Sequence, residues 1–297
     1  MTLPIATLPL RHALLAVAVM AVWGTNFVVI KSALDHLPPL FFATLRFALV
    51  VVPAAFFLRR PNVPWRELTA YGVLIGAGQF GLLYMAIDGR ISPGLASLVV
   101  QTQVFFTIGL VMFVDGERLK PFQYAALGLA VAGLATIGWH TDGTTTIPGL
   151  VLVLLAALSW SLGNLVARRA GRVDMLAYVV WGSMFSAPPL LAMSLLVEGW
   201  PAIARGFVQA DVWTWLAVAW QSVGNSLFGY AAWGWLLARY PAASVSPMAL
   251  LVPVFGIAAS AFWLGEDLPA WKLTAAALVL GGLAVNLLWP MLARRAR

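Results

Sequence analysis

The sequence predicts an all-α integral membrane protein in which ten transmembrane helices form two inverted five-helix repeats. Three observations support this prediction: the composition, the lengths of the apolar runs and an internal repeat. Hydrophobic residues make up 62% of the 297 positions, charged residues only 10%, and the mean hydropathy is +0.90. Soluble domains carry about 25% charged residues. This chain cannot cover a water-exposed surface, so its outer surface must face lipid.

Each membrane crossing needs roughly 20 apolar residues, because the hydrocarbon core is about 30 Å thick. Backbone groups in lipid must satisfy their own hydrogen bonds, so these runs are expected to be helices. Proline or glycine marks many of the boundaries between them. The predicted spans are 13–31, 39–58, 67–87, 92–114, 121–139, 148–168, 176–197, 212–238, 244–264 and 270–292.

Charge placement predicts the orientation, because positive residues concentrate in cytoplasmic loops. With both termini in the cytoplasm, thirteen Lys and Arg residues fall inside and four outside. The first span follows Arg11 and His12 and is expected to be retained rather than cleaved as a signal peptide. The inside set is Arg11, Arg59, Arg60, Arg66, Arg118, Lys120, Arg168, Arg169, Arg172, Arg239, Arg294, Arg295 and Arg297; the outside set is Lys31, Arg90, Arg205 and Lys272.

An internal repeat emerges when positions 149 residues apart are compared. A segment that begins at Ser97 leads after one span to Gly116-Glu117, and a segment that begins at Ser246 leads likewise to Gly265-Glu266. Residues 1–140 and 147–297 would each hold five spans, an odd number, so the second copy inserts upside down. Inverted repeats are typical of carriers that expose one midplane site alternately to each side.

Five segments follow one another in a characteristic order: residues 23–31 (Trp-Gly-Thr-Asn-Phe-Val-Val-Ile-Lys), 38–47, 95–107, 116–119 (Gly-Glu-Arg-Leu) and 250–256. This order resembles the EamA family of ten-helix carriers in the drug/metabolite transporter superfamily. The closest likeness is to the YddG and EamA-type bacterial amino-acid exporters. The resemblance implies export of amino acids or related metabolites by rocking of helix groups.

Ionisable residues are almost absent from the predicted spans. All eleven Asp and Glu residues and all three His residues fall in loops or at helix ends. Proton-coupled carriers usually need a buried titratable group, so the sequence favours a downhill facilitator. Arg46 alone lies well inside a span. It has two interpretations: a structural side chain that snorkels to the interface, which we favour, or a group that holds a substrate carboxylate.

Neutral polar and aromatic side chains within the spans are therefore the candidates for substrate binding. Residues three or four apart share a helix face, which pairs Trp160 with Asn164 and Gln221 with Asn225. Gln101 and Gln103 lie about 200° apart on a helix, so one of them is expected to face the cavity, with Gln101 favoured. The predicted substrate site is Asn26, Gln79, Tyr84, Gln101, Trp160, Asn164, Trp181, Gln221, Asn225 and Tyr230.

Other interpretations stay open at this point. Membrane Asn and Gln residues can simply join helices, and many of the 14 Trp residues must be interface anchors. The rival functions are an exporter of other small metabolites or drugs by proton antiport, a passive channel, and a multispan membrane enzyme. The scattered histidines disfavour the enzyme.

Partners and cofactors follow from the same residues. No nucleotide-binding Gly-Lys-Ser loop occurs, and we expect no cofactor, no metal and no nucleic-acid partner. We expect a monomer that binds small-molecule substrate and membrane lipid, a multi-pass protein of the bacterial inner membrane.

Overall fold

The fold is a bundle of helices, seen in a computed structural model that describes residues 8–116, 119–141, 143–171 and 173–295. Within these ranges every regular element is helical. The first half of the chain forms α1 (Leu10–Ala33), α2 (Pro39–Ala54), α3 (Trp65–Val73), η1 (Leu74–Gly81), α4 (Leu82–Ile87), α5 (Pro93–Val99), η2 (Val100–Thr102), α6 (Gln103–Asp115) and α7 (Pro121–Trp139).

The second half repeats this order of long and broken helices. It forms α8 (Ile147–Arg169), α9 (Met175–Ser183), α10 (Ala187–Val197), α11 (Trp200–Gln209), α12 (Val212–Ala219), η3 (Trp220–Phe228), α13 (Gly229–Arg239), α14 (Ala242–Val245), η4 (Ser246–Leu250), α15 (Leu251–Leu264) and α16 (Ala270–Arg295).

Eight helical stretches are long and apolar enough to cross a membrane, and each lies at one of the predicted spans. Two predicted spans are not among them. The helix Pro39–Ala54 has only 16 residues. The predicted span 212–238 is helical throughout, as α12, η3 and α13, but the polar residues of η3 reduce its hydropathy. The count of ten spans therefore stays a prediction.

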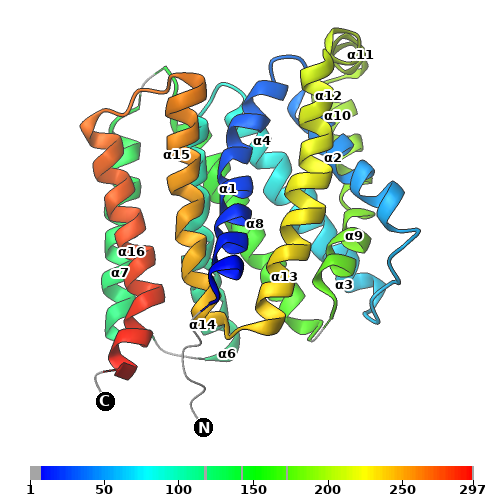
Figure 1. Cartoon of the computed structure of the whole chain (residues 1–297). Coiled ribbons are helices and arrows are strands. Elements are labelled where there is room, and N and C mark those ends of the chain that lie inside the picture. The colour runs from blue at the N-terminus through cyan, green and yellow to red at the C-terminus, as the bar shows by residue number, and fades with distance from the viewer. Residues whose placement is uncertain (1–7, 117–118, 142, 172, 296–297) are drawn as a thin grey trace.

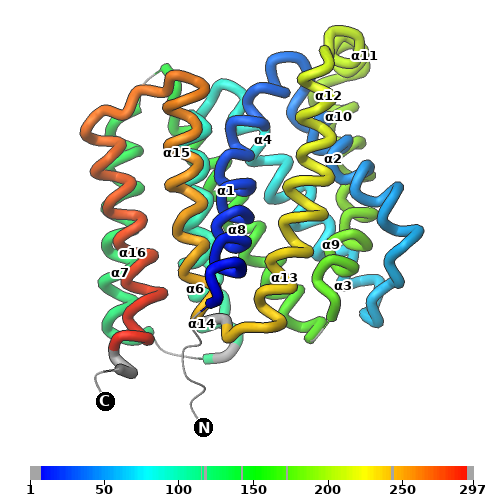
Figure 2. The backbone as a smooth tube through the Cα atoms, in the orientation of Figure 1, coloured from blue at the N-terminus to red at the C-terminus, as the bar shows by residue number. Residues whose placement is uncertain are grey.

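The first residues of α1 and the last residues of α16 lie at the same end of the bundle (Figure 1), which we call the termini end; it also carries the last residues of α8 and α13. The opposite end, here the far end, carries the last residues of α1 and α15. Tracing the chain in Figure 2 shows that α7 runs toward the far end, whereas its packing partner α16 runs back toward the termini end. The α15 helix likewise runs opposite to α5, against which it lies.

Irregular helix segments recur at corresponding places in the two halves. The π-helical segments η1 and η3 begin 146 residues apart, at Leu74 and Trp220, and the 3₁₀ segments η2 and η4 also begin 146 residues apart. Gly116 and Gly265 end α6 and α15 with φ of +70° and +64°. Glycine adopts this left-handed geometry without steric cost.

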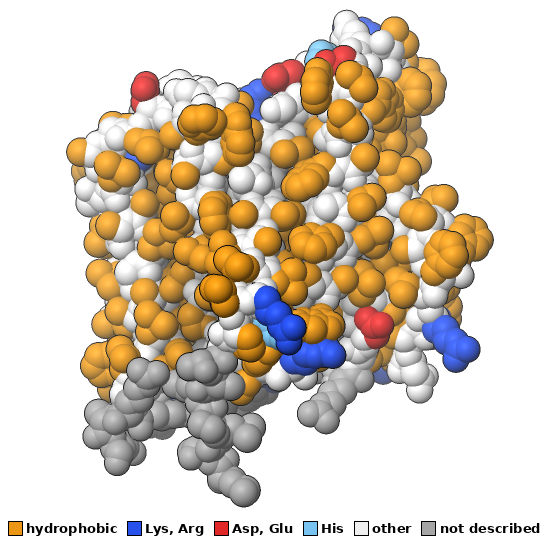
Figure 3. Space-filling model, in the orientation of Figure 1, with side chains coloured by type: hydrophobic (Ala, Val, Ile, Leu, Met, Phe, Trp, Pro, Cys, Tyr) orange, Lys and Arg blue, Asp and Glu red, His pale blue; other side chains and the backbone are white. Residues whose placement is uncertain are grey.

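Apolar side chains are spread over the face of the bundle that Figure 3 shows. Large apolar side chains such as Phe56, Phe113, Leu196 and Phe262 are more than four-fifths exposed. Apolar exposure of this extent would be unstable in water and is favourable in a bilayer. Most of the acidic side chains visible in Figure 3 lie at the far end.

Candidate functional site

Arg46, on α2, is at the centre of a polar network inside the bundle. Its side chain is buried, with 1% of the residue exposed. The guanidinium donates hydrogen bonds to the Tyr84 hydroxyl at 3.1 Å, Asn225 Oδ1 at 2.9 Å and Ser226 Oγ at 3.2 Å. It also lies 3.7 Å from the centre of the Phe80 ring. The expectation that Arg46 snorkels to the interface is therefore wrong: buried neutral groups hold it in place.

The network continues from Arg46 through predicted site residues on other helices. The Tyr84 hydroxyl donates to Gln221 Oε1 at 3.0 Å, and Gln221 Nε2 donates to Asn26 Oδ1 at 2.6 Å. Four of the predicted residues, from α1, α4 and η3, thus meet around one arginine. Their separation along the chain made this arrangement invisible to helix-face arguments.

The two π-helical segments place amide side chains at mid-bundle. A π turn widens the helix and frees a carbonyl that needs another donor, and such turns are frequent at functional sites. Ser159 Oγ donates to Leu74 O at 2.8 Å in η1, and Ser226 Oγ donates to Gln221 O at 3.0 Å in η3. These hydroxyls satisfy the altered backbone beside Gln79 and Asn225.

A cavity of about 330 Å³ adjoins this network. Seven of the ten predicted residues line it: Asn26, Gln79, Gln101, Trp160, Asn164, Asn225 and Tyr230. Tyr84 and Gln221 are not among the lining residues: Gln221 donates a hydrogen bond to Asn26, which lines the cavity, and Tyr84 is bonded to Gln221. Aromatic and amide residues outside the predicted set also line it: Trp23, Tyr71, Phe80, Gln103 and Trp233.

Some of these additional residues carried a sequence signal. Trp23 lies three residues before Asn26, and Trp233 three residues after Tyr230, so each shares a helix face with a predicted residue. Tyr71 and Phe80 carried no such signal, because an ordinary apolar core also contains aromatic residues at these spacings.

Gln101 and Gln103 both line the cavity, so the expectation that one of them faces away is wrong. The reason is the 3₁₀ segment η2, which ends at Thr102. In a 3₁₀ helix, with three residues per turn, side chains two residues apart are separated by roughly 120° around the axis. In an α-helix the separation of about 200° corresponds to about 160° by the shorter way round. Gln103 Oε1 also accepts a hydrogen bond from Asn164 Nδ2 at 3.3 Å.

Trp181 lies apart from the other predicted residues. Its indole N–H donates to Leu58 O at 3.1 Å, and its ring packs edge-on against Trp65 at the start of α3. It is not among the residues that line the cavity. These contacts join α9 to the segment that follows α2.

The cavity reaches toward the termini end and is separated from the far end. Ala167, Met175 and Leu237, which lie close to the ends of α8, α9 and α13, line its termini side. On the other side the lining residues Ile30 and Leu83, which lie close to the far-end ends of α1 and α4, are buried, with at most 2% of each residue exposed.

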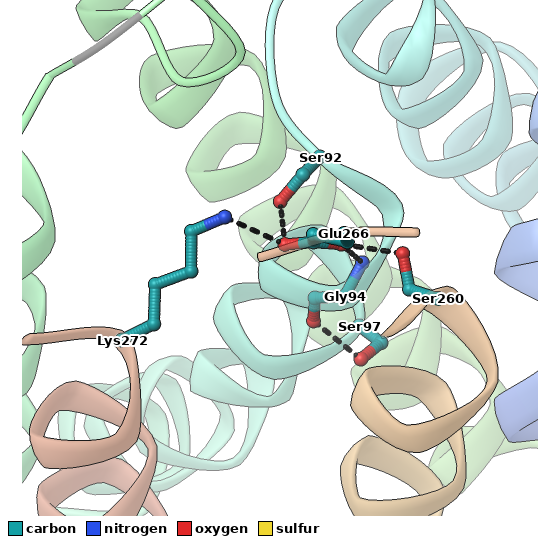
Figure 4. A network of polar contacts seen from close by, with 6 residues as sticks. All are labelled: Ser92, Gly94, Ser97, Ser260, Glu266 and Lys272. Carbon is teal, nitrogen blue, oxygen red and sulfur yellow. Dashed lines mark hydrogen bonds and ion pairs between the residues drawn. The ribbon is translucent and has the colours of Figure 1, made fainter. Parts of the chain in front are cut away.

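A second hollow of about 930 Å³ lies at the far end and shares no lining residue with the first. Glu266 lies in its wall and forms an ion pair with Lys272 at 2.9 Å, with both side chains less than a tenth exposed. Figure 4 shows that the same carboxylate accepts hydrogen bonds from Ser92, Ser260 and the backbone N–H of Gly94. It thereby caps the N-terminus of α5 from the opposite half of the chain.

Charged groups are absent from the wall of the smaller cavity, as far as the described residues show. Across the described ranges, no three His, Asp or Glu side chains form a group that could hold a metal ion. What the wall offers is hydrogen-bond donors and acceptors on neutral amides, beside aromatic faces. Such a surface suits a small polar molecule.

Comparison with known proteins agrees with this geometry. The chain matches the family described as the EamA-like transporter family twice, over residues 10–139 and 147–288. It is 41% identical over 293 residues to a probable amino-acid metabolite efflux pump of Salmonella typhimurium, covering 97% of this chain and 98% of that protein. A protein of the same description from Escherichia coli is 38% identical, with coverages of 93% and 94%.

Among solved structures, one crystal structure of a protein superposes with a TM-score of 0.63 at 22% sequence identity. The superposition covers 96% of this chain and 97% of the other. At that identity the likeness concerns the fold alone.

Proposed function

Because the chain belongs to the EamA-like transporter family, we propose that it is a bacterial inner-membrane carrier that exports amino acids and related small metabolites by alternating access. It is a multi-pass membrane protein, and its relatives are described as probable amino-acid metabolite efflux pumps. The substrate class and the transport mechanism are the proposed parts.

The observation that carries the proposal is the amide-lined cavity at mid-bundle. Its volume of about 330 Å³ lies at the lower end of the range for small-molecule sites. Amides can hydrogen-bond both an ammonium and a carboxylate, and the rings of Trp23, Trp160 and Tyr230 offer apolar contact to a side chain. A small zwitterion therefore fits the wall better than a lipid tail or a large cation.

Alternating access is supported by the two halves of the chain. The family match occurs once in each half, and the packed pairs α7 with α16 and α5 with α15 run in opposite directions. The cavity reaches one end of the bundle, while the buried side chains of Ile30 and Leu83 line it toward the other. In this proposal the structure represents one of two access states, and ten spans form the two inverted repeats.

The direction of access follows from the positive-inside rule. Arg60, Arg169 and Arg239 follow or end helices at the termini end, and cytoplasmic loops are enriched in such residues. We therefore assign the termini end to the cytoplasm. The cavity then faces the cytoplasm, where an exporter loads its substrate.

Transport down the substrate's own gradient is the form of coupling that the cavity supports. No acidic or histidine side chain of the described residues lines it. The buried carboxylate of Glu266 lies in the separate far-end hollow and is engaged by Lys272. A proton-coupled mechanism would need a titratable group that responds to substrate.

The test is uptake of a panel of radiolabelled amino acids into proteoliposomes without an imposed proton gradient. We expect saturable uptake and counterflow, with uptake weakened by Trp160→Ala in the wall and by Gln221→Ala behind it. Trp139→Ala is the matched control, because Trp139 is 87% exposed on the outer surface. Absence of amino-acid uptake contradicts the proposed substrate class, and a strict requirement for a pH gradient contradicts downhill coupling.

A further inference from the structure

Arg46 can only donate hydrogen bonds, and this fixes the direction of every bond that starts from it. A guanidinium has five N–H donors and no acceptor. Asn and Gln amides can be turned either way, so their orientation is set by the network around them. Here Arg46 fixes the orientation of the amides, because any hydrogen-bond partner of Arg46 must present an oxygen to it.

The first branch of the network ends at Asn225. Its Oδ1 accepts from Arg46 at 2.9 Å, so its Nδ2 group must point elsewhere. Asn225 lines the cavity, and in the described part of the chain its Nδ2 has no hydrogen-bond partner. Two N–H donors are thus available at the cavity wall.

The second branch runs through Tyr84 to Asn26. The Tyr84 hydroxyl accepts from Arg46, so its single proton goes to Gln221 Oε1. Gln221 must then present Nε2 to Asn26, and does so to Oδ1 at 2.6 Å. Asn26 also lines the cavity and is left with an Nδ2 group that no described residue accepts from.

The positive charge of Arg46 and these N–H donors both favour an anionic group in the cavity. None of the ion pairs among the described residues involves Arg46. Its partners are neutral, and the Phe80 ring that lies 3.7 Å from it also lines the cavity. A positive charge without a counter-ion in a medium of low dielectric favours an anionic group nearby.

Gln79 differs from these two residues, because no hydrogen bond to a described residue fixes the orientation of its amide. Its Oε1 is buried and lacks a hydrogen-bond partner among the described residues, although the residue lines the cavity. An unpaired buried acceptor is costly, and an ammonium group would satisfy it. The cavity therefore offers donors at Asn26 and Asn225, and at Gln79 an amide that can turn its oxygen toward an ammonium group.

We infer that the site recognises the carboxylate of a zwitterionic amino acid through Asn26 and Asn225, whose donors are turned toward the cavity by Arg46. Arg46 is a positioning residue: it acts through Asn225 and through the Tyr84–Gln221 relay. This inference rests on the proposed function and narrows its substrate class. Amines and amino-acid amides, which lack the anionic group, are poor substrates.

The experiment measures competition in proteoliposomes, comparing an amino acid with its own carboxamide and with the decarboxylated amine. In the wild type we expect the amino acid to compete at roughly 10- to 100-fold lower concentration, as the loss of charge-assisted hydrogen bonds predicts. In Arg46→Gln, whose amide can donate or accept, the ratio should fall to about threefold or less. Arg46→Lys, which still only donates, should retain most of the discrimination.

Tyr84→Phe distinguishes the contribution of the Tyr84–Gln221 relay from that of the Arg46 charge. It breaks the branch to Asn26 and leaves Asn225 bonded to Arg46. An intermediate ratio is expected. Tyr178→Phe is its control: Tyr178 is fully buried, and its hydroxyl has no hydrogen-bond partner among the described residues. That variant should keep the wild-type ratio.

The outcomes distinguish this inference from the proposed function. If the wild type transports amino acids but competes equally with amines, the inference is overturned and the carrier function stands. The same holds if Arg46→Gln transports with an unchanged ratio. Should Arg46→Gln not fold, the ratios of Tyr84→Phe and Arg46→Lys decide. Absence of any amino-acid transport in the wild type overturns the proposed function itself.

Discussion

Glu266 accepts a hydrogen bond from the backbone N–H of Gly94 at 3.1 Å, so a carboxylate from the second half of the chain caps a helix of the first half. A Cβ on residue 94 would lie 2.8 Å from that carboxylate oxygen. Glycine at 94 is therefore what allows the carboxylate to reach the end of α5. This contact joins the two halves at the end of the bundle opposite to the open cavity.

The Glu266–Lys272 pair gives the first prediction. Glu266→Gln leaves the Lys272 ammonium buried without its counter-ion, and breaking a buried pair costs about 3–5 kcal/mol. We expect a large fall in the unfolding temperature in detergent, followed by tryptophan fluorescence. Asp267→Asn is the control, since Asp267 is exposed on the same loop. In a double-mutant cycle with Lys272→Met, additive effects would show that the pair does not contribute to stability.

Close helix packing between α7 and α16 gives the second prediction. A Cβ on Gly282 would lie 2.5 Å from the carbonyl oxygen of Ala126, whereas one on the adjacent Gly281 meets nothing within 4 Å. Gly282→Ala should destabilise the protein by about 1–3 kcal/mol through overpacking. Gly281→Ala should be neutral or stabilising by up to about 1 kcal/mol, from helix propensity. Thermal unfolding of both variants checks this, and equal effects would contradict the packing of α16 against α7.

The N-terminus of α12 gives a prediction on pH. The backbone N–H of Thr214 and its hydroxyl, which donate to Asp211 at 2.8 and 2.7 Å, lower the pKa of that carboxyl from its ordinary value of 3.8. A carboxyl whose pKa is lower in the folded state binds fewer protons there than when unfolded. Its stabilising effect is full above pH 3.8 and is lost as the pH falls through the lowered pKa.

Asp211→Asn tests this, because asparagine keeps a capping oxygen but does not titrate. The unfolding temperature of the wild type should exceed that of the variant near neutral pH. The difference should shrink as the pH falls below that of a free aspartate. A difference that is constant across the acid range would show that the carboxylate charge has no part in the cap.

Access to the cavity gives the last prediction. The chain contains no cysteine, so single cysteines can be labelled without removing native thiols. Met175→Cys, at the cavity's termini side, should react with a membrane-impermeant maleimide in inside-out vesicles and not in intact spheroplasts. Gly143→Cys, in the far-end hollow, should show the reverse. The opposite pattern would contradict the assignment of the termini end to the cytoplasm.

Much of the candidate site could be predicted from the sequence, because few polar residues occur inside apolar spans. Such residues are costly in lipid, so those that occur need a reason. This argument identified Asn26, Gln79 and Asn225, all of which line the cavity. The prediction of aromatic wall residues was weaker and misplaced Trp181. Aromatic residues are common in membrane spans, so the presence of one gives no information about what it contacts.

The sequence by itself determined that the chain is a helical membrane protein, where most of its spans lie and that it resembles the EamA family. These properties depend on composition and on local periodicity, which a linear chain displays directly. The tertiary structure alone decided that Arg46 is buried with neutral partners, that both Gln101 and Gln103 face the cavity and that Glu266 caps α5. Each of these depends on contacts between helices far apart in the chain, or on a local change in helix winding. The spacing of residues along the sequence reveals neither.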